Sequence, residues 1–377
     1  MATPDAIHHG MVSVAPSQAG HVNQPTIPTC DTIIDLTVLK GDKLKSVVLE
    51  LIATLFPDWA KGVTEYQLDR VSGALTNAVF FVSAPNRDRL LLRVYGIGCD
   101  QIVDRENELA WLARLSQLNV GPRLLATFGN GRFEEYMPSV TLTRDDIRDP
   151  DTSVLIAKGM RRLHAISKVY PPTSTDRLEI WVNVDKFYRV VLSILPELYR
   201  KNEGWAKVLR EYNIERLQHE IAQCKAITEA ANSPIVFAHN DTQPGNILRC
   251  HDGELVIVDF EYAGYNPRGF DIANHFCEWM YDYHSDTPAS METENYPTEE
   301  QQMRFLSAYV AEAKAEHSDA PSVEALSKEV AVWVMAGHVL WGLWGLIQAN
   351  QSEIDFDYFL YSIQRLNAFR NEFSKYA

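Results

Sequence analysis

The sequence predicts an α+β fold of two lobes: a small lobe with a five-stranded antiparallel sheet and one helix, and a large lobe that is mainly helical. Two observations support this prediction. Period-two alternation of apolar residues, typical of strands, is concentrated before residue 137, and helical spacing dominates afterwards. With 377 residues, 46% of them hydrophobic, the chain is long enough to give both lobes a core.

The small lobe is expected to begin with a helix over residues 43–55, where apolar residues recur at i, i+3, i+4 and i+7 and Pro57 follows. A second helix is expected over residues 104–118, which ends before Gly121-Pro122. Alternation and turn residues predict the five strands. They span residues 66–71, 78–83, 89–95, 123–128 and 132–136.

The large lobe is expected to follow a hinge at residues 137–139. The predicted organisation is a disordered tail over 1–35, a lobe over 36–138 and a helical lobe over 139–377. Apolar periodicity places its helices at residues 152–164, 182–199, 213–231, 270–283, 298–316, 323–349 and 355–373.

The charge balance and the cysteines limit the class of protein. The chain has 35 Lys and Arg against 50 Asp and Glu, a formal charge of −15, which argues against general nucleic-acid binding. Its five cysteines form no C-x-x-C pair, as expected of a reduced intracellular protein. The first thirty residues have no Lys or Arg and no apolar core, unlike a secretory signal. We therefore expect a cytoplasmic protein.

One segment resembles a membrane span by composition. Residues 331–349 are nearly uncharged, but His338, Gln348 and three glycines interrupt them, and no second span accompanies them. We expect a buried helix of the large lobe and no membrane insertion.

The most informative motif is H-x-D-x-x-x-x-N, formed by His239, Asp241 and Asn246, with Asp259 a dozen residues later. Such a carboxylate can orient or accept a hydroxyl proton, while an amide and a second carboxylate can hold Mg²⁺ against nucleotide phosphates. The motif alone also occurs by chance, because His and Asp cap turns. A predicted hairpin over residues 247–258, with Asp-Gly in its turn, brings the loop beside Asp259 and favours a phosphoryl-transfer site.

A longer segment is similar to a known family. Residues 258–283 read VDFEYAGYNPRGFDIANHFCEWMYDY, which closely resembles the signature of choline kinases. The resemblance runs from about residue 66 to 369 and includes LLRVY at 91–95, NGRFEE at 130–135 and HVLWGLW at 338–344. It implies a protein-kinase-like fold that uses ATP and Mg²⁺ to phosphorylate the hydroxyl group of choline. The product would be phosphocholine, and the reaction would be the first step of phosphatidylcholine synthesis by the CDP-choline route.

The nucleotide is expected to bind residues of the small lobe. The turn over residues 72–77 can place backbone N–H groups against phosphate oxygens, with Ser72 and Asn77 as polar contributors. Arg93 lies on the third predicted strand, where protein kinases have the phosphate-binding lysine, and choline kinases resemble this chain in using arginine. Its partner on the following helix should be Glu108, with Glu106 as the alternative.

In the large lobe, Asp241 is expected to orient or deprotonate the acceptor hydroxyl. Asp259 is the principal predicted metal ligand, and Asn246 and Gln243 are close enough to bind the metal or its water. Glu261 stands where protein kinases have glycine and is a candidate ligand of a second Mg²⁺ or a structural residue.

The acceptor is expected to bind aromatic side chains. Ring faces and an acid suit a quaternary ammonium, which cannot donate a strong hydrogen bond. Helical spacing places four polar residues on one face, Asp271, His275, Glu278 and Asp282, among Trp279, Tyr281 and Tyr283. Most such aromatics belong to a core, but the family resemblance assigns choline contacts to Glu278, Tyr283, Trp341, Trp344 and Tyr361. Asp271, His275 and His164 are expected to be structural.

Three alternatives stay open. An ethanolamine kinase would share the ATP residues and differ at the cationic head, and the many aromatics favour choline, with ethanolamine as a slower substrate. An aminoglycoside-type phosphotransferase would need an acidic, open pocket. A non-catalytic adaptor would not be expected to keep Asp241, Asn246 and Asp259 together. The sequence does not fix the oligomeric state, and a homodimer stays open.

Overall fold

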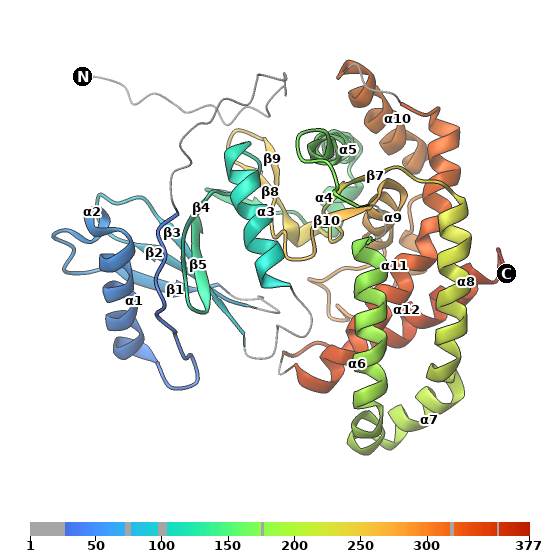
Figure 1. The fold of residues 1–377 in the computed structure, drawn as a ribbon, viewed down its shortest axis with the longest axis horizontal. Coiled ribbons are helices and arrows are strands. Elements are labelled where there is room, and N and C mark those ends of the chain that lie inside the picture. The colour runs from blue at the N-terminus through green and yellow to red at the C-terminus, as the bar shows by residue number, and fades with distance from the viewer. Residues whose placement is uncertain (1–26, 72–76, 97–103, 175–176, 317–319, 353) are drawn as a thin grey trace. The chain divides into compact units, whose positions relative to one another are not determined.

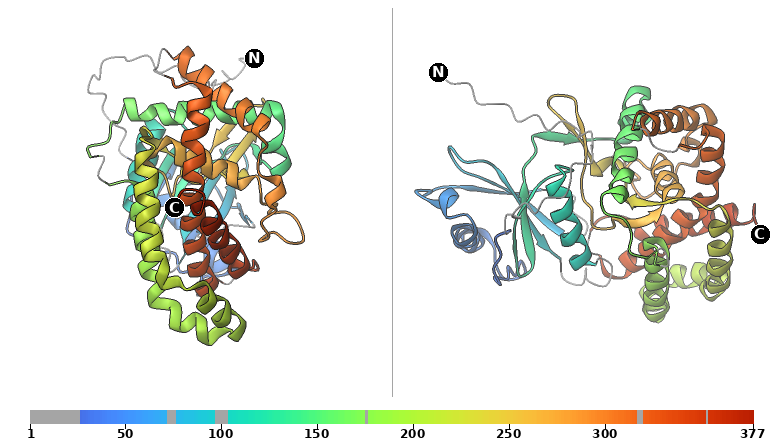
Figure 2. Two further views of the ribbon diagram at one scale, coloured as in Figure 1. Left: turned by 90° about the vertical axis from the view of Figure 1, so that its right-hand side faces the viewer. Right: turned by 45° about the horizontal axis from the view of Figure 1, so that its top comes forward.

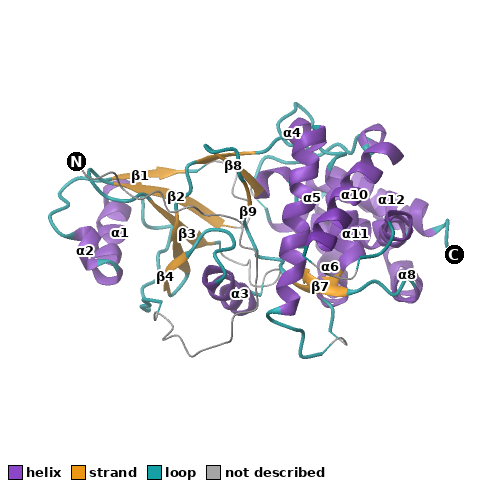
Figure 3. Cartoon of the chain, turned by 90° about the horizontal axis from the view of Figure 1, so that it is seen from above, coloured by secondary structure: helices purple, strands orange, loops and turns teal. Residues whose placement is uncertain are grey.

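The computed structural model describes residues 27–71, 77–96, 104–174, 177–316, 320–352 and 354–377. The chain divides into two compact units, Met1–Pro138 and Ser139–Ala377. Strands are concentrated in the first unit and helices in the second, as Figure 3 shows by colour. This confirms the predicted α+β fold class.

The first unit is a five-stranded antiparallel sheet in the order β1-β2-β3-β5-β4 (Figure 1). Two helices, α1 and α3, lie on opposite sides of it (Figure 2). The helices are α1 (Gly41–Leu55), α2 (Pro57–Ala60) and α3 (Arg105–Gln117). The strands are β1 (Gln67–Arg70), β2 (Asn77–Ser83), β3 (Leu90–Tyr95), β4 (Leu124–Phe128) and β5 (Gly131–Glu135).

Alternate residues of the sheet build the core of this unit. Leu92 on β3 pairs in register with Phe80 on β2 and Phe133 on β5, and all three side chains are buried. They pack with the apolar face of α1, including Val48 and Ile52. The period of two along each strand and of 3.6 along α1 therefore place their apolar residues in one layer.

The second unit combines helices with two small sheets, of order β6-β8-β9 and β10-β7. Its long central helix α11 contacts α6, α9 and α12. The helices are α4 (Arg144–Arg148), α5 (Pro150–His164), α6 (Glu179–Lys201), α7 (Glu203–Tyr212), α8 (Leu217–Ala230), α9 (Arg268–Glu278), α10 (Glu299–Ala315), α11 (Val323–Gln351) and α12 (Tyr358–Phe373). The strands are β6 (Ser139–Thr141), β7 (Ile235–Ala238), β8 (Ile247–Cys250), β9 (Leu255–Ile257) and β10 (Gly264–Pro267).

Two of the predicted helix boundaries differ from the structure by four or more residues. The helix expected from residue 213 begins at Leu217, because Asn213 has a left-handed φ of 58° and ends α7, which the sequence analysis missed. The helix expected over 270–283 ends at Glu278. Asp282 therefore lies in the loop after α9 and not on the predicted polar helix face.

Helix α11 is long and apolar enough to cross a membrane by length and composition alone. Its apolar window is 89% buried inside the protein, as in the core helix of a globular unit. The expectation of a buried helix is confirmed.

Candidate active site

The loop between β7 and β8 holds the predicted catalytic residues against one another. Asn246 donates from Nδ2 to the backbone oxygen and to Oδ2 of Asp241, both at 2.9 Å. Its Oδ1 accepts from Gln243 Nε2 at 3.1 Å, while Gln243 Oε1 accepts the N–H of Gly245. The turn Pro244–Asn246 is a short 3-10 helix, which Pro244 starts. The loop thus brings together Asp241, Gln243 and Asn246, as the sequence predicts.

A buried acid on α9 supports the same loop. Asp271 accepts the backbone N–H groups of His239 and Asn240 at 3.0 and 2.7 Å. His164 Nε2 lies 2.8 Å from Asp271 and its Nδ1 lies 2.7 Å from the hydroxyl of Tyr309. Burial alone would raise the pKa of Asp271, but the hydrogen bonds and the charge of His164 bring that pKa below its ordinary value.

His275, one turn further along α9, lies with its Nδ1 2.8 Å from the carbonyl oxygen of Thr242. It therefore holds the loop at the residue that follows Asp241. The expected structural roles of Asp271, His275 and His164 are confirmed.

Asp259 lies next to this loop at the end of β9. Val258 donates its N–H to the carbonyl oxygen of Asn246 at 2.9 Å, and His239 Nε2 lies 2.9 Å from the carbonyl oxygen of Val258. Asp259 itself has a left-handed φ of 67°, which is uncommon outside glycine and is tolerated best by Asn and Asp. Strained backbone of this kind is concentrated at functional sites, where it aims a side chain.

The negative charges of several carboxylates raise the pKa of Asp241. Burial raises the pKa of Asp241 well above its ordinary value, and the charges of Glu278, Glu261 and Asp259 raise it further. Three acids around one half-buried carboxylate favour the binding of a compensating cation. Carboxylate and amide oxygens are the ligands Mg²⁺ prefers, so Asp259, Glu261 and Asn246 fit this ion.

The predicted acceptor residues form one cluster of rings in the second unit. Trp341 and Trp344 on α11 have ring centroids 5.6 Å apart and lie edge to face, and Trp344 lies 6.2 Å from Tyr361 on α12. Tyr281 lies 5.0 Å from Tyr361 and stacks on Tyr283 at 5.7 Å. The cluster therefore gathers four of the five predicted choline contacts.

Polar bonds fix the orientation of these rings. Trp341 Nε1 donates to Asn274 on α9 at 2.7 Å, and Trp344 Nε1 donates to the hydroxyl of Tyr262 at 3.0 Å. Since each indole N–H has a buried partner, the rings cannot turn without losing a hydrogen bond.

Glu278, the fifth predicted contact, accepts from the hydroxyl of Tyr283 at 2.6 Å and from Arg365 Nη2 at 2.5 Å. Arg365 is buried and its guanidinium lies over the rings of Tyr281 and Tyr361, 4.6 and 5.2 Å from their centroids. Sequence reasoning missed Arg365, although its position four residues after Tyr361 on a predicted helix was a signal for contact between the two.

The predicted nucleotide residues belong to the first unit. Arg93 Nε lies 3.4 Å from Glu134 on β5. Glu108 on α3 lies 2.8 Å from both Arg105 and Arg132. Glu106 also lies in the first turn of α3. Ser72 and the turn that contains it lie outside the described residues. Asn77 begins β2, and only its backbone is described.

Comparisons with known proteins show the family to which the chain belongs. The family model for choline/ethanolamine kinase matches residues 68–370. Probable choline kinase 2 of Arabidopsis thaliana is 34% identical over 340 residues, 88% of this chain and 93% of the relative. The choline/ethanolamine kinase of Homo sapiens is 35% identical over 327 residues, 80% of this chain and 78% of the relative.

Two solved structures share the fold. The Plasmodium vivax ethanolamine kinase has a TM-score of 0.73 at 25% identity, covering 88% of this chain and 91% of its own. The choline kinase of Cryptosporidium parvum has a TM-score of 0.71 at 26% identity, and the match covers 88% of this chain and 96% of that one. The two-lobed, protein-kinase-like fold is thereby confirmed, and the chain belongs to the choline/ethanolamine kinase family.

Proposed function

We propose that the protein transfers the γ-phosphoryl group of ATP to the hydroxyl group of choline, giving phosphocholine and ADP. The observation that supports this most is the position of Asp241. It is half-buried, and after the loss of solvation the charge of Glu278, which accepts a hydrogen bond from a ring of the cluster, contributes most to its raised pKa. The charges of Glu261 and Asp259 raise that pKa further. One carboxylate is therefore close both to the proposed metal ligands and to the proposed pocket for the cationic head.

Asp241 would act on the acceptor. Its raised pKa makes the ionised carboxylate a stronger base, so it can orient the choline hydroxyl and accept its proton as the oxygen bonds to the γ-phosphorus and ADP leaves. Asn246 holds Asp241 in place through two hydrogen bonds.

Mg²⁺ and ATP would be bound by the remaining predicted residues. Asp259, Asn246 and Glu261 would hold Mg²⁺, with Gln243 near its water, and the ion when bound would neutralise charge on the phosphates. In the first unit, Ser72, Asn77 and Arg93 would contact the nucleotide, and Glu108 would support them through its arginines.

Recognition of the head group would rest on ring faces. Because Glu278 pairs with Arg365, part of its charge is already balanced by the guanidinium before a ligand arrives. A quaternary ammonium has no N–H group, so it gives up no hydrogen bonds when it faces rings, whereas a primary ammonium needs hydrogen-bond acceptors. We therefore infer a preference for choline, with ethanolamine as a slower substrate.

The same proposal includes a cytoplasmic location and no membrane insertion, and the burial of α11 supports the second of these. A homodimer is a further expectation, which light scattering of the purified protein would test.

The function is tested by coupled measurement of ADP release with choline, with ethanolamine and without an acceptor. We expect Mg²⁺-dependent release with choline, a lower kcat/KM for ethanolamine and little release without acceptor. An ethanolamine kcat/KM equal to or above that of choline would make ethanolamine kinase the better assignment. No acceptor-dependent release with either alcohol would refute the proposal.

A further inference from the structure

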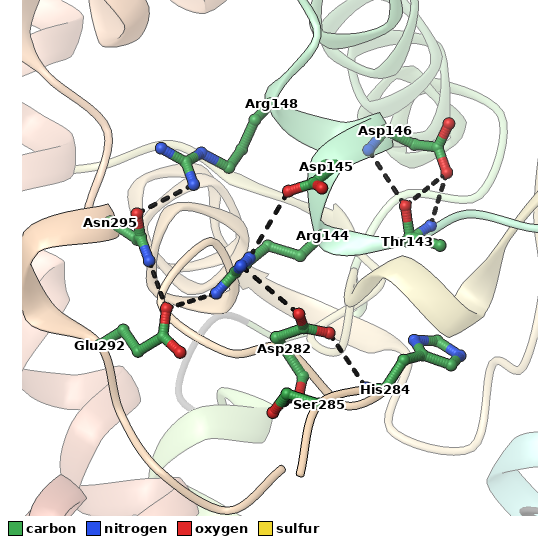
Figure 4. A network of polar contacts seen from close by, with 10 residues as sticks. All are labelled: Thr143, Arg144, Asp145, Asp146, Arg148, Asp282, His284, Ser285, Glu292 and Asn295. Carbon is green, nitrogen blue, oxygen red and sulfur yellow. Dashed lines mark hydrogen bonds and ion pairs between the residues drawn. The ribbon is translucent and has the colours of Figure 1, made fainter. Parts of the chain in front are cut away.

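Arg144 joins the two ends of the loop that follows α9. It is the first residue of α4, whose start is fixed by a capping box between Thr143 and Asp146. Its Nη2 lies 3.4 Å from Asp282 Oδ2 and its Nη1 donates to Glu292 Oε2 at 2.5 Å. Figure 4 shows the guanidinium between these two carboxylates. The Arg144 side chain is 16% exposed, so solvent screens these contacts only partly.

Further bonds fix the far end of this loop. Glu292 donates its backbone N–H to the carbonyl oxygen of Met280 at 2.9 Å, which closes the loop. Asn295 Nδ2 donates to the same Glu292 oxygen that Arg144 contacts, and Arg148 Nη1 donates to Asn295 Oδ1 at 2.9 Å (Figure 4). Two arginines of α4 thus hold one end of the loop, and only Arg144 also reaches the other end.

The loop carries a ring of the proposed acceptor pocket. Tyr283 directly follows Asp282, stacks on Tyr281 and donates its hydroxyl to Glu278. The Asp282 side chain is also bound within the loop, because its Oδ1 accepts the N–H of His284 at 3.0 Å. A shift of Asp282 would therefore move the adjacent ring relative to Glu278.

We propose that Arg144 is a positioning residue for the acceptor pocket, holding the loop 281–292 so that Tyr283 faces the cationic head. This inference rests on the proposed function. Without the guanidinium, two partly buried carboxylates would meet with no cation between them. The loop ends would then separate, and the pocket would lose a preorganised ring.

The test is Arg144→Gln in the full chain. We expect the choline KM to rise about fivefold or more, with kcat and the ATP KM within about twofold of wild type. Hydrogen exchange of the loop 281–292 should become faster, because its closing bond to Met280 opens more often. Arg144→Lys keeps the charge but reaches one carboxylate at a time, so it should restore part of the choline affinity.

A matched control is Arg304→Gln on α10, which removes an equivalent charge from an ion pair with Glu300 and should leave both KM values unchanged. Glu292→Gln is a second variant and should also raise the choline KM. The rise in choline KM of the double variant with Arg144→Gln should be smaller than the combined effects of the two single variants, because both remove the same contact.

The inference is overturned if Arg144→Gln and Glu292→Gln leave the choline KM within about twofold of wild type, or raise both KM values equally. Unchanged exchange of the loop would overturn it as well. If wild type phosphorylates neither alcohol, the proposed function fails, but the exchange comparison still decides whether Arg144 holds the loop.

Discussion

Replacing Trp344 with leucine should weaken choline binding by removing a ring face. Trp344 is 7% exposed, and its ring centroid lies 5.6 Å from that of Trp341 and 6.2 Å from that of Tyr361. One cation–π contact contributes roughly 0.5–2 kcal/mol. Since about 1.4 kcal/mol corresponds to a factor of ten in an equilibrium constant, Trp344→Leu should raise the choline KM about two- to thirtyfold.

Trp344→Phe separates the ring face from the rest of the side chain. It keeps an aromatic face but loses the hydrogen bond from the indole N–H to Tyr262, so the choline KM should rise only about twofold. Initial rates at varied choline and varied ATP would give both constants. The ATP KM should stay near wild type in both variants.

Trp333 offers a control on the same helix. It is 1% exposed and packs on Trp181 and Phe270, each with ring centroids 6.3 Å away. Trp333→Phe should lower the melting temperature without changing the choline KM of the folded enzyme. A normal choline KM for Trp344→Leu, or an equal rise in its ATP KM, would show that this ring does not contact the choline head.

Three further predictions concern Asp241 and its neighbours. Asp241→Asn should abolish turnover but raise the melting temperature at neutral pH. Because the pKa of Asp241 is higher in the folded state, its carboxyl group destabilises the fold as pH rises above the pKa of the unfolded state, whereas an amide does not ionise. A lower melting temperature of the variant by calorimetry would contradict this. For the same reason kcat/KM for choline should fall with decreasing pH on a limb centred well above 3.8, and a limb near the ordinary aspartate value would exclude Asp241 as the titrating group. Asp259→Asn should leave the protein folded by circular dichroism and increase the Mg²⁺ concentration needed for half-maximal activity, whereas an unchanged Mg²⁺ requirement would remove Asp259 from the proposed ligand set.

Local patterns were sufficient to predict most of the fold. The strands β2 and β3 begin and end within about one residue of the alternating segments, because period-two burial and turn residues mark both ends. The hairpin of β8 and β9 was found from its Asp-Gly turn. The short strands β7 and β10 were missed, since four-residue segments that pair across a distance in sequence have no local signal.

The candidate site was predictable where a motif names its residues and not where partners come from distant elements. Asp241, Gln243 and Asn246 lie within six residues, and the structure brings them together. Arg365 contacts Glu278 across 87 residues, and no spacing rule connects them.

The contact between Arg144 and Glu292 spans 148 residues and depends on how α4 packs beside a loop. Such pairings follow from tertiary structure alone, because local chain geometry favours only contacts a few residues apart.

In the proposed reaction, the half-buried carboxylate of Asp241 serves both the bound nucleotide and the ring cluster for a quaternary ammonium alcohol. Phosphorus NMR of the enzyme with Mg²⁺, ATP and choline tests it most directly. We predict equal amounts of ADP and phosphocholine with wild type, and neither with Asp241→Asn. Inorganic phosphate formed in place of phosphocholine, or full activity of the Asp241→Asn variant, would rule out this role of Asp241.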